Sequence, residues 1–503
     1  MSRTFELETL KMRLSDPEFR PLDLHQRIQR ALRGLILDGA LGPGVKLPAT
    51  RALAKSLAVS RDTVENAYVQ LQRDGFVLRR KGSGSYVCET IGAQLRGPSR
   101  RRQLQQGLPA HSPEPGAGLS RRGAALLARG GVSDQQAVTA FATGLPETRS
   151  FPLEVWERLQ RQALKDYRAS VLLHGDPQGA LPLRKAIAAY LNLERGAKVQ
   201  PEQILVLSST RQALFLCAQL LVDAGKPILM ENPGYFGARK AFEAAEARIV
   251  PIDVDGQGIR TDLLRADRSG ARCVYVTPSH QYPTGATLSL ERRLELTRWA
   301  AEHDRWIIED DYDSEFHYAG RPTACVQGLD AHERTLYIGT FTKSLFPGLR
   351  IGYMVLPPAL VAPMTVARSL QDGHNASLAQ LTLARFIAGG HFGAYVRGMR
   401  NLYGERLGFL AERVGKRLGG LVEPRVPAGG LQMPGLLCAG IDETRAIAAA
   451  YRAGVELVGL SALHLAAPPR AGFLMGFAAY TTDELEAAVG VLAKTLRGLR
   501  ANP

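Results

Sequence analysis

The sequence predicts an α/β protein in two folded parts: a small helical N-terminal domain ending in a basic hairpin, and a large domain with a mainly parallel sheet. Helical spacing of apolar residues dominates the first part, which we assign to residues 1–88. A stretch rich in Arg, Gly, Pro, Ser and Gln follows over residues 89–136. From residue 137 to 503, strand-like apolar runs alternate with amphipathic helices, which is typical of a doubly wound sheet.

Composition narrows the class of protein. Of 503 residues, 45% are hydrophobic, and 63 Lys and Arg against 48 Asp and Glu give a net charge of +15. That excess is compatible with an anionic partner such as nucleic acid. The five cysteines lack the CxxC spacing of a zinc site and fit a reducing compartment. With no signal-peptide core and no apolar run near the roughly 20 residues of a membrane span, we expect a cytoplasmic protein without a membrane partner.

The N-terminal domain is expected to contain three helices and a hairpin. Apolar residues at helical spacing mark the first helix between Leu24 and Ile36, after Asp23, which is suited to capping. Pro48 leads the second helix, and a tight turn at 58–60 separates it from a third helix that starts at Arg61. Residues 76–88 then alternate as two short strands around a basic, glycine-containing turn.

Helix, turn, helix and basic hairpin form the outline of a winged helix-turn-helix, whose third helix enters the major groove and whose wing rests on phosphates. Side chains at the start of the third helix reach base edges, and an arginine there is suited to guanine. The predicted DNA-binding residues are Arg51, Ser60, Arg61, Thr63, Arg79, Lys81 and Gly82. The alternative is a small protein-interaction domain with solvated charges.

Three segments carry a closer likeness. LPATRALA (47–54), VSRDTV (59–64) and GSGSYV (82–87) resemble the GntR-type winged helix-turn-helix of bacterial regulators. By that resemblance Arg51, Arg61, Thr63 and Gly82 match positions that touch DNA. Glu65 stands where some relatives carry a basic residue, so the resemblance does not carry over a base preference.

Residues 89–136 are expected to form a long, mostly flexible linker, since they lack a sustained apolar period before residues 124–127. The basic run within residues 96–102 suits either non-specific attraction to DNA or a merely soluble spacer.

In the large domain, polar residues follow the strand-like runs, where ligands of such sheets bind. Ser208, Ser209 and Thr210 follow one run and open a helix, so their hydroxyl and N–H groups suit a phosphate. Tyr235 follows the next run and is able to cover a flat ring. Asp310 and Tyr312 follow the buried run WII.

Lys343 lies between two apolar runs, with Thr340 before it and Arg350 after it. A partly desolvated lysine loses its proton readily and condenses with an aldehyde, so Lys343 is the predicted Schiff-base residue, flanked by phosphate ligands. Together, the hydroxyl groups suited to a phosphate, the tyrosine that is able to cover a ring, the carboxylate and the lysine suit pyridoxal 5′-phosphate (PLP). Taken singly, each has a plainer explanation, such as a surface turn for Lys343 or a strand-end cap for Asp310.

The order of these motifs also resembles fold-type I PLP enzymes, the aspartate aminotransferase superfamily, over residues 144–491. The resemblance implies a small C-terminal α+β subdomain beside the large one. It implies that Lys343 binds PLP covalently, Asp310 pairs with the pyridine nitrogen, Tyr312 bonds the ring hydroxyl and Tyr235 stacks on the ring. The implied phosphate ligands are Ser208, Ser209, Thr210, Thr340 and Arg350.

Two further implications concern the ring hydroxyl and assembly. Tyr282 occupies the position where aminotransferases usually have an Asn, and His280 or Gln281 is expected to substitute. Residues 175–191 match a segment that lies near the partner subunit's site, which implies a homodimer.

The chain combines both resemblances, and in this it resembles MocR-type transcriptional regulators. Its segments DDYDSEFHY (310–318) and FTKSLFPGLRIGY (341–353) are also similar to that group. That resemblance implies a head-to-tail homodimer that binds operator DNA and senses PLP or its adduct with an amino acid or amine. It favours a sensor over an enzyme. Two alternatives stay open: an active aminotransferase with an appended DNA-binding module, and an α/β protein whose PLP site does not function.

One departure bears on the effector. Aminotransferases hold the substrate carboxylate with an arginine near the last strand, where this chain has Phe473, Leu474 and Met475. Arg470 lies a few residues early, and Arg239 is a second candidate. If neither reaches the site, sensing of PLP itself is favoured over sensing of an amino acid adduct.

Overall fold

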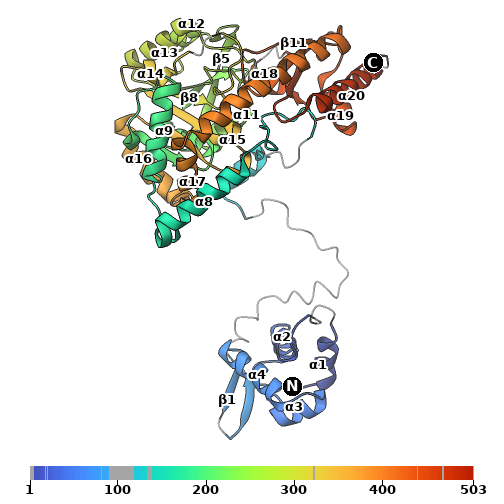
Figure 1. Ribbon diagram of the computed structural model, residues 1–503. Coiled ribbons are helices and arrows are strands. Elements are labelled where there is room, and N and C mark those ends of the chain that lie inside the picture. Colours follow the sequence, from blue (N-terminus) through green and yellow to red (C-terminus); the bar gives the residue numbers. More distant parts are fainter. Residues whose placement is uncertain are drawn as a thin grey trace. The chain divides into compact units, whose positions relative to one another are not determined.

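The computed structural model describes residues 5–16, 19, 21–80, 82–89, 118–132, 139–320, 323–438, 440–466 and 470–501. The chain divides into two compact units, Met1–Ala117 and Gly118–Pro503, which are drawn in Figure 1. Lys81 and most of the expected linker lie outside the described residues.

The N-terminal unit contains the three predicted helices and the hairpin, and one more helix. Its strands pair antiparallel, with Val77 opposite Val87, and an isolated bridge from Lys46 to Tyr86 adds a third segment to the hairpin. Ser60 caps the third predicted helix by accepting a hydrogen bond from the Thr63 N–H at 3.1 Å. The elements are α1 (Leu7–Leu14), α2 (Leu24–Leu37), α3 (Thr50–Leu57), α4 (Arg61–Arg73), β1 (Val77–Arg80) and β2 (Gly84–Val87).

Helix α1 was not predicted. It packs on α2 through Leu10, which is fully buried, and Arg13 Nη2 lies 3.0 Å from Asp38 Oδ2. Leu7, Leu10 and Leu14 recur at helical spacing, so the signal was present, but it spans only two turns.

The C-terminal unit is built on an eight-stranded mixed sheet, which confirms the predicted α/β class. The strand order is β3-β10-β9-β8-β7-β4-β5-β6. Neighbours from β9 through β5 run parallel, whereas β10 is antiparallel to both β3 and β9. Only residues 341–351 connect β9 to β10, which is shorter than a parallel crossover needs. The strands are β3 (Ile204–Leu207), β4 (Pro227–Asn232), β5 (Arg248–Asp255), β6 (Gly258–Ile259), β7 (Cys273–Val276), β8 (Trp306–Asp311), β9 (Thr335–Thr340) and β10 (Gly352–Val355).

Helices cover both faces of this sheet, so successive strand residues enter different cores. In β9, Tyr337 packs into the core formed with α9, α17 and α18, while Ile338 packs into the core formed with α10, α11 and α16. The helices of this part are α8 (Leu153–Tyr167), α9 (Leu181–Glu194), α10 (Thr210–Leu221), α11 (Phe236–Ala244), α12 (Thr261–Ala266), α13 (Leu290–Glu302), α14 (Val326–Leu329), α15 (Phe341–Ser344), α16 (Pro358–Asp372), α17 (Ser377–Ala388) and α18 (His391–Arg417).

A small C-terminal subdomain follows α18, as the resemblance implied. Its four strands have the order β11-β12-β14-β13, all paired antiparallel. Its elements are β11 (Val422–Pro424), β12 (Gln432–Leu437), α19 (Glu443–Arg452), β13 (Val458–Gly459), β14 (Gly472–Gly476) and α20 (Thr482–Ala501). Among the described residues, no helix combines the length and the hydropathy that crossing a bilayer requires.

The end of the expected linker is helical and belongs to the C-terminal unit. Helix α7 (Arg121–Arg129) packs on α11, and the Arg129 guanidinium and the Lys240 ammonium donate to the carbonyls of Glu243 and Arg129, respectively. Arg122 pairs with Glu246 at 3.1 Å. The structure thus places this helix in a range that composition assigned to a flexible tether.

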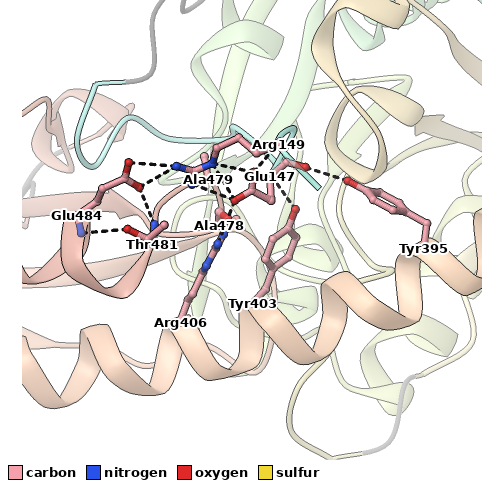
Figure 2. Close-up of polar contacts among 9 residues, drawn as sticks. All are labelled: Glu147, Arg149, Tyr395, Tyr403, Arg406, Ala478, Ala479, Thr481 and Glu484. Carbon is pink, nitrogen blue, oxygen red and sulfur yellow. Dashed lines mark hydrogen bonds and ion pairs between the residues drawn. The ribbon is translucent and has the colours of Figure 1, made fainter. Parts of the chain in front are cut away.

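Glu147 joins the segment before α8 to α18. Its carboxylate accepts hydrogen bonds from Arg149, at 2.9 Å from Nη2, and from Arg406 Nη2 of α18, at 3.0 Å. Its backbone N–H donates to Tyr403 Oη at 2.7 Å, and its carbonyl accepts from Tyr395 Oη at 2.8 Å. Figure 2 shows Arg406, Tyr403 and Tyr395 reaching Glu147 from α18, with Arg149 beside it.

The same cluster extends to the turn before α20. Arg149 Nη1 donates to Glu484 Oε1 at 3.1 Å, and Glu484 accepts from the Thr481 N–H at 2.6 Å (Figure 2). Burial acts to raise the pKa of Glu147, but the hydrogen bonds from Arg149 and Arg406 outweigh it and leave the pKa below its usual value.

We predict that Glu147→Gln destabilises the C-terminal unit by about 3 kcal/mol at pH 7, because Arg406 stays buried without its anionic partner. Urea unfolding followed by tryptophan fluorescence measures this, since all three tryptophans lie in that unit. The folded-state pKa is depressed, so the contribution is present above the usual value of 4.5 and is lost as the pH falls below it. The gap between the variant and the wild type should therefore narrow at acidic pH.

Glu412→Gln is the matched control, because Glu412 pairs only with Lys416 on the exposed side of α18 and such pairs contribute little. Equal effects of the two substitutions would contradict the role given to Glu147.

Candidate functional site

A cavity of about 660 Å³ lies where the strands of the large sheet end. Thr277 follows β7, Thr340 ends β9, and Ser209 follows β3, so the cavity lies beyond the carboxyl ends of these three strands. The small subdomain supplies another part of the wall, formed by Leu431, Gln432, Glu456, Val458, Ala462 and Leu463. Of the predicted cofactor residues, the cavity is lined by Ser209, Thr210, Tyr235, Tyr312, Thr340, Lys343 and Arg350.

Lys343 lies on α15, a single helical turn in the segment that was expected to be a turn between two strands. Its Nζ donates to the carbonyl of Gly144 at 2.6 Å. Gly144 has a φ of +71°, and a Cβ added there would lie 2.6 Å from Lys343 Nζ. A glycine at 144 therefore makes room for the lysine head group, and both residues line the cavity.

Hydroxyl, N–H and guanidinium groups gather beside Lys343. Ser209 caps α10 by accepting from the Gln212 N–H at 3.2 Å, so the first turn of that helix opens on the cavity at Thr210. Arg350 has a φ of +54°, and its carbonyl accepts from Asn375 Nδ2 at 3.4 Å. A helix N-terminus with a guanidinium and hydroxyls is suited to a phosphate group.

Asp310 and Asp311, adjacent at the end of β8, have opposite environments. Asp310 Oδ2 accepts from Tyr275 Oη at 2.8 Å, while Oδ1 is buried without a hydrogen-bond partner among the described residues. Burial raises the pKa of Asp310 to about 7, against a lowering by the Tyr275 hydrogen bond.

Asp311 Oδ2, by contrast, accepts from Arg195 Nε at 2.9 Å, Tyr337 Oη at 2.5 Å and Ser314 Oγ at 2.8 Å. Burial acts to raise the pKa of Asp311 as well, but Arg195 and these hydrogen bonds leave it below its usual value. Each of the two carboxylates keeps an Oδ1 that is buried without a hydrogen-bond partner among the described residues. They differ in that Asp311 is paired with the Arg195 guanidinium, whereas no ion pair among the described residues neutralises Asp310, so Asp310 is the carboxylate better suited to a cationic donor from outside the chain.

Three tyrosines form the aromatic wall. The ring of Tyr282 lies 5.4 Å from that of Tyr235 and 6.3 Å from that of Tyr312, edge to face in both cases. Tyr312 Oη donates to the carbonyl of His280 at 3.0 Å. Burial raises the pKa of Tyr312 well above its usual value, so its hydroxyl remains a donor.

Three predicted cofactor residues are not among the described residues that line the cavity: Ser208, His280 and Asp310. Ser208 Oγ donates to Gln212 Oε1 at 2.8 Å. The His280 ring pairs through Nδ1 with Asp313 Oδ1 at 2.8 Å and stacks on His317.

Some lining residues were missed. Gly144 and Glu456 line the cavity but stand in no motif that the sequence singled out. Arg211 and Thr277 also line it, and both belong to polar stretches that the sequence places after strands. Tyr275, the hydrogen-bond partner of Asp310, offered a usable signal: a tyrosine in a strand that is otherwise fully apolar needs a partner for its hydroxyl.

The predicted DNA-binding residues divide by environment. Arg51 and Arg61 are exposed, and Gly82 has a φ of +78° at the tip of the hairpin. Ser60 and Thr63 are engaged with each other in the cap of α4, at 2.7 Å between their hydroxyl oxygens. Arg79 Nη1 lies 2.6 Å from Glu65 Oε1, which joins the hairpin to α4 and lowers the pKa of Glu65.

Comparison with known proteins assigns each of the two units to a family. Residues 138–436 match the profile of the family "Aminotransferase class I and II", and residues 24–87 match "Bacterial regulatory proteins, gntR family". The "Probable rhizopine catabolism regulatory protein MocR" of Rhizobium meliloti is 33% identical over 479 residues, which is 95% of each chain. The chain belongs to the MocR-type regulators.

Two further relatives show how a MocR-type chain is related to regulators and to enzymes. The HTH-type transcriptional regulator TauR of Rhodobacter capsulatus is 32% identical over 392 residues, covering 76% of this chain and 77% of TauR. The kynurenine aminotransferase of Pyrococcus horikoshii superposes with a TM-score of 0.67 at 27% identity, over 72% of this chain and 92% of its own.

We predict that Asp310→Asn raises the thermal stability of the protein without added ligand at pH 8, by on the order of 1 kcal/mol, because it removes a buried charge with an unused acceptor. The folded-state pKa is raised above the usual 3.8, so the native state holds the proton up to about pH 7 and stability declines as pH rises through that window. The gain should disappear at pH 4.

Asp311→Asn is the matched control and should destabilise at pH 8, since it takes the anion from Arg195. Thermal midpoints at both pH values measure both effects. A loss of stability in Asp310→Asn at pH 8 would show that its carboxylate is a structural ion like its neighbour.

Proposed function

We propose that this MocR-type regulator binds PLP covalently at Lys343 and that PLP, or its adduct with an amino acid or amine, changes its binding to operator DNA. The observation that carries the proposal is the shared cavity: Lys343 Nζ lies against Gly144 in a space also lined by Ser209, Thr210 and Arg350. Binding that favours one arrangement of the chain over another would shift DNA affinity by the difference in ligand affinity.

The residues present fit the cofactor. Ser209, Thr210, Thr340 and Arg350 would hold the phosphate, and Ser208 would support the same turn. Asp310 has a buried acceptor available for the pyridine nitrogen. Tyr235 would cover the ring and Tyr312 would donate to its hydroxyl, while His280 would act behind Tyr312 through its carbonyl. When bound, PLP supplies an aldehyde for a primary amine and a ring that withdraws electrons.

In the N-terminal unit, we propose that Arg61 reads a base edge and that Arg51, Arg79 and Lys81 contact phosphates. Gly82 would let the wing approach the backbone of the DNA. Ser60 and Thr63 would act chiefly by fixing the first turn of α4, since their hydroxyls bond each other.

We further propose a cytoplasmic, head-to-tail homodimer, with residues 1–88 as the DNA-binding domain, 89–136 as the linker and 137–503 as the effector domain. The end of this linker is the helix α7, which packs on the effector domain. The match to residues 175–191 supports the dimer. The alternative function is an active aminotransferase, favoured by the similarity to the kynurenine aminotransferase. Against it, Arg470 is exposed and Arg239 pairs with Glu243, and neither is among the described residues that line the cavity.

We predict that Arg61→Ala weakens binding to the preferred operator by roughly 1–3 kcal/mol and relaxes one base position. Arg73→Ala, at the opposite end of α4, is the matched control and should leave the base preference unchanged. Fluorescence anisotropy with the operator and single-base variants measures both. Unchanged operator affinity in Arg61→Ala would refute the proposed docking of α4.

We predict that incubation with PLP and reduction with borohydride attaches one phosphopyridoxyl group per chain, at Lys343, as mass spectrometry of the digested protein would show. Lys343→Ala should abolish the attachment with an unchanged circular dichroism spectrum, whereas Lys198→Ala, at an exposed lysine, should retain it. Attachment at another lysine, or none in the wild type, would refute the proposed cofactor site.

A further inference from the structure

We infer that the effector is a primary amine without a carboxylate beside its amino group, and that the cavity discriminates against α-amino acids. The inference rests on the proposed function, since it concerns the space next to Lys343 into which an effector would enter. Three observations carry it: the apolar surface around β14, the distribution of cations, and the position of Glu456.

The first observation is the packing of β14. Phe473 and Met475 are fully buried in the main core of the unit. Leu474, between them, is also fully buried but faces the other way, into a small apolar cluster with Leu460 and Leu463. Of these, Leu463 lines the cavity.

The same cluster continues along the cavity wall. Tyr282 and Val458 pack against it and line the cavity, and Ala462 lines it beside Leu463. The part of the wall next to β14, where an arginine was sought, is thus formed by aliphatic and aromatic side chains.

The second observation concerns the cations. Among the described lining residues, the cationic side chains are Arg211, Lys343 and Arg350, and all three come from the large subdomain. Arg211 lies in the first turn of α10, next to Thr210, and its Nη1 donates to the carbonyl of Val132 at 3.1 Å. Arg211 and Arg350 therefore belong to the side of the cavity suited to the phosphate.

The third observation is that, among the described lining residues, the small subdomain contributes a carboxylate and no cationic side chain. Glu456 lines the cavity, and its backbone N–H donates to the carbonyl of Ala140 at 2.9 Å, which fixes its position on the wall. A carboxylate on an effector would meet this anion and the apolar surface, and would lose hydration without gaining a guanidinium. An amine with an apolar or cationic remainder meets no such penalty.

Exchange of amines at the cofactor balances without any further reactant. The effector's amino nitrogen forms a C=N bond to the cofactor's aldehyde carbon, and the bond from that carbon to Lys343 Nζ breaks. The two hydrogens of the incoming amine pass to Nζ, so nothing is oxidised or reduced. Discrimination therefore depends on the remainder of the effector.

The test uses the full-length protein loaded with PLP and pairs of compounds that differ by one carboxylate: 3-methylbutylamine with L-leucine, and 1,5-diaminopentane with L-lysine. The concentration giving a half-maximal change in the visible absorbance of bound PLP is measured, along with operator affinity. In each pair we expect the amine to act at least tenfold below the amino acid. Amino acids acting at equal or lower concentrations, or amines without effect on bound PLP, would overturn the inference.

Two variants locate the cause. Glu456→Gln removes the anion and should narrow the gap within each pair. Leu474→Arg supplies a guanidinium and should shift the preference toward the amino acids, and if that buried substitution prevents folding, Glu456→Gln and the wild-type comparison still decide. An unchanged gap in Glu456→Gln would refute the role of Glu456. Failure of PLP to attach to Lys343 would instead refute the proposed function, so the two failures are distinguishable.

Discussion

The buried ion cluster around Glu147 is the contact on which the cavity depends. Residues 143–145 form part of the cavity wall, and Glu147 follows them directly. Because Arg406, Tyr403 and Tyr395 of α18 hold Glu147 by side chain and backbone, this segment is fixed to α18. Arg149, two residues on, joins it to Glu484 of α20 in the C-terminal subdomain. The carbonyl of Gly144 is thereby presented to Lys343. Residues of both subdomains therefore share one cavity wall.

The adjacent carboxylates of Asp310 and Asp311 are placed by the fold in different surroundings. Asp310 and Asp311 leave β8 in consecutive positions, so their side chains point to opposite faces of the sheet. Asp311 meets Arg195 and hydroxyl groups on one face, whereas the hydrogen-bond partner of Asp310 among the described residues is Tyr275 on the other. A buried carboxylate without a cationic partner lowers the stability of the fold, and a ligand that donates to it would recover that free energy.

The MocR-type architecture also explains why the two units resemble different proteins. The N-terminal unit has its own core of leucines, isoleucines and one buried tyrosine, and α1 adds to it. The C-terminal unit keeps an aminotransferase sheet, yet the surface around β14 is apolar where an amino acid would need a guanidinium. The cavity thus combines Lys343 and the hydroxyl and guanidinium groups near it with an apolar wall beside β14.

Sequence alone determined the fold class and the winged helix-turn-helix, and it predicted seven of the residues that line the cavity, because periodicity and strand-end motifs are local. Lys343, Thr340 and Arg350 lie within eleven residues of one another, and the hydroxyl-bearing turn is continuous at 208–210. Tertiary structure decided what depends on long-range packing: that His280 pairs with Asp313, that Gly144 meets Lys343 across 199 positions, and that Glu456 lines the cavity. It also showed that Leu474, and not Phe473 or Met475, faces the apolar cluster behind the wall, because only packing shows on which side of β14 a side chain lies.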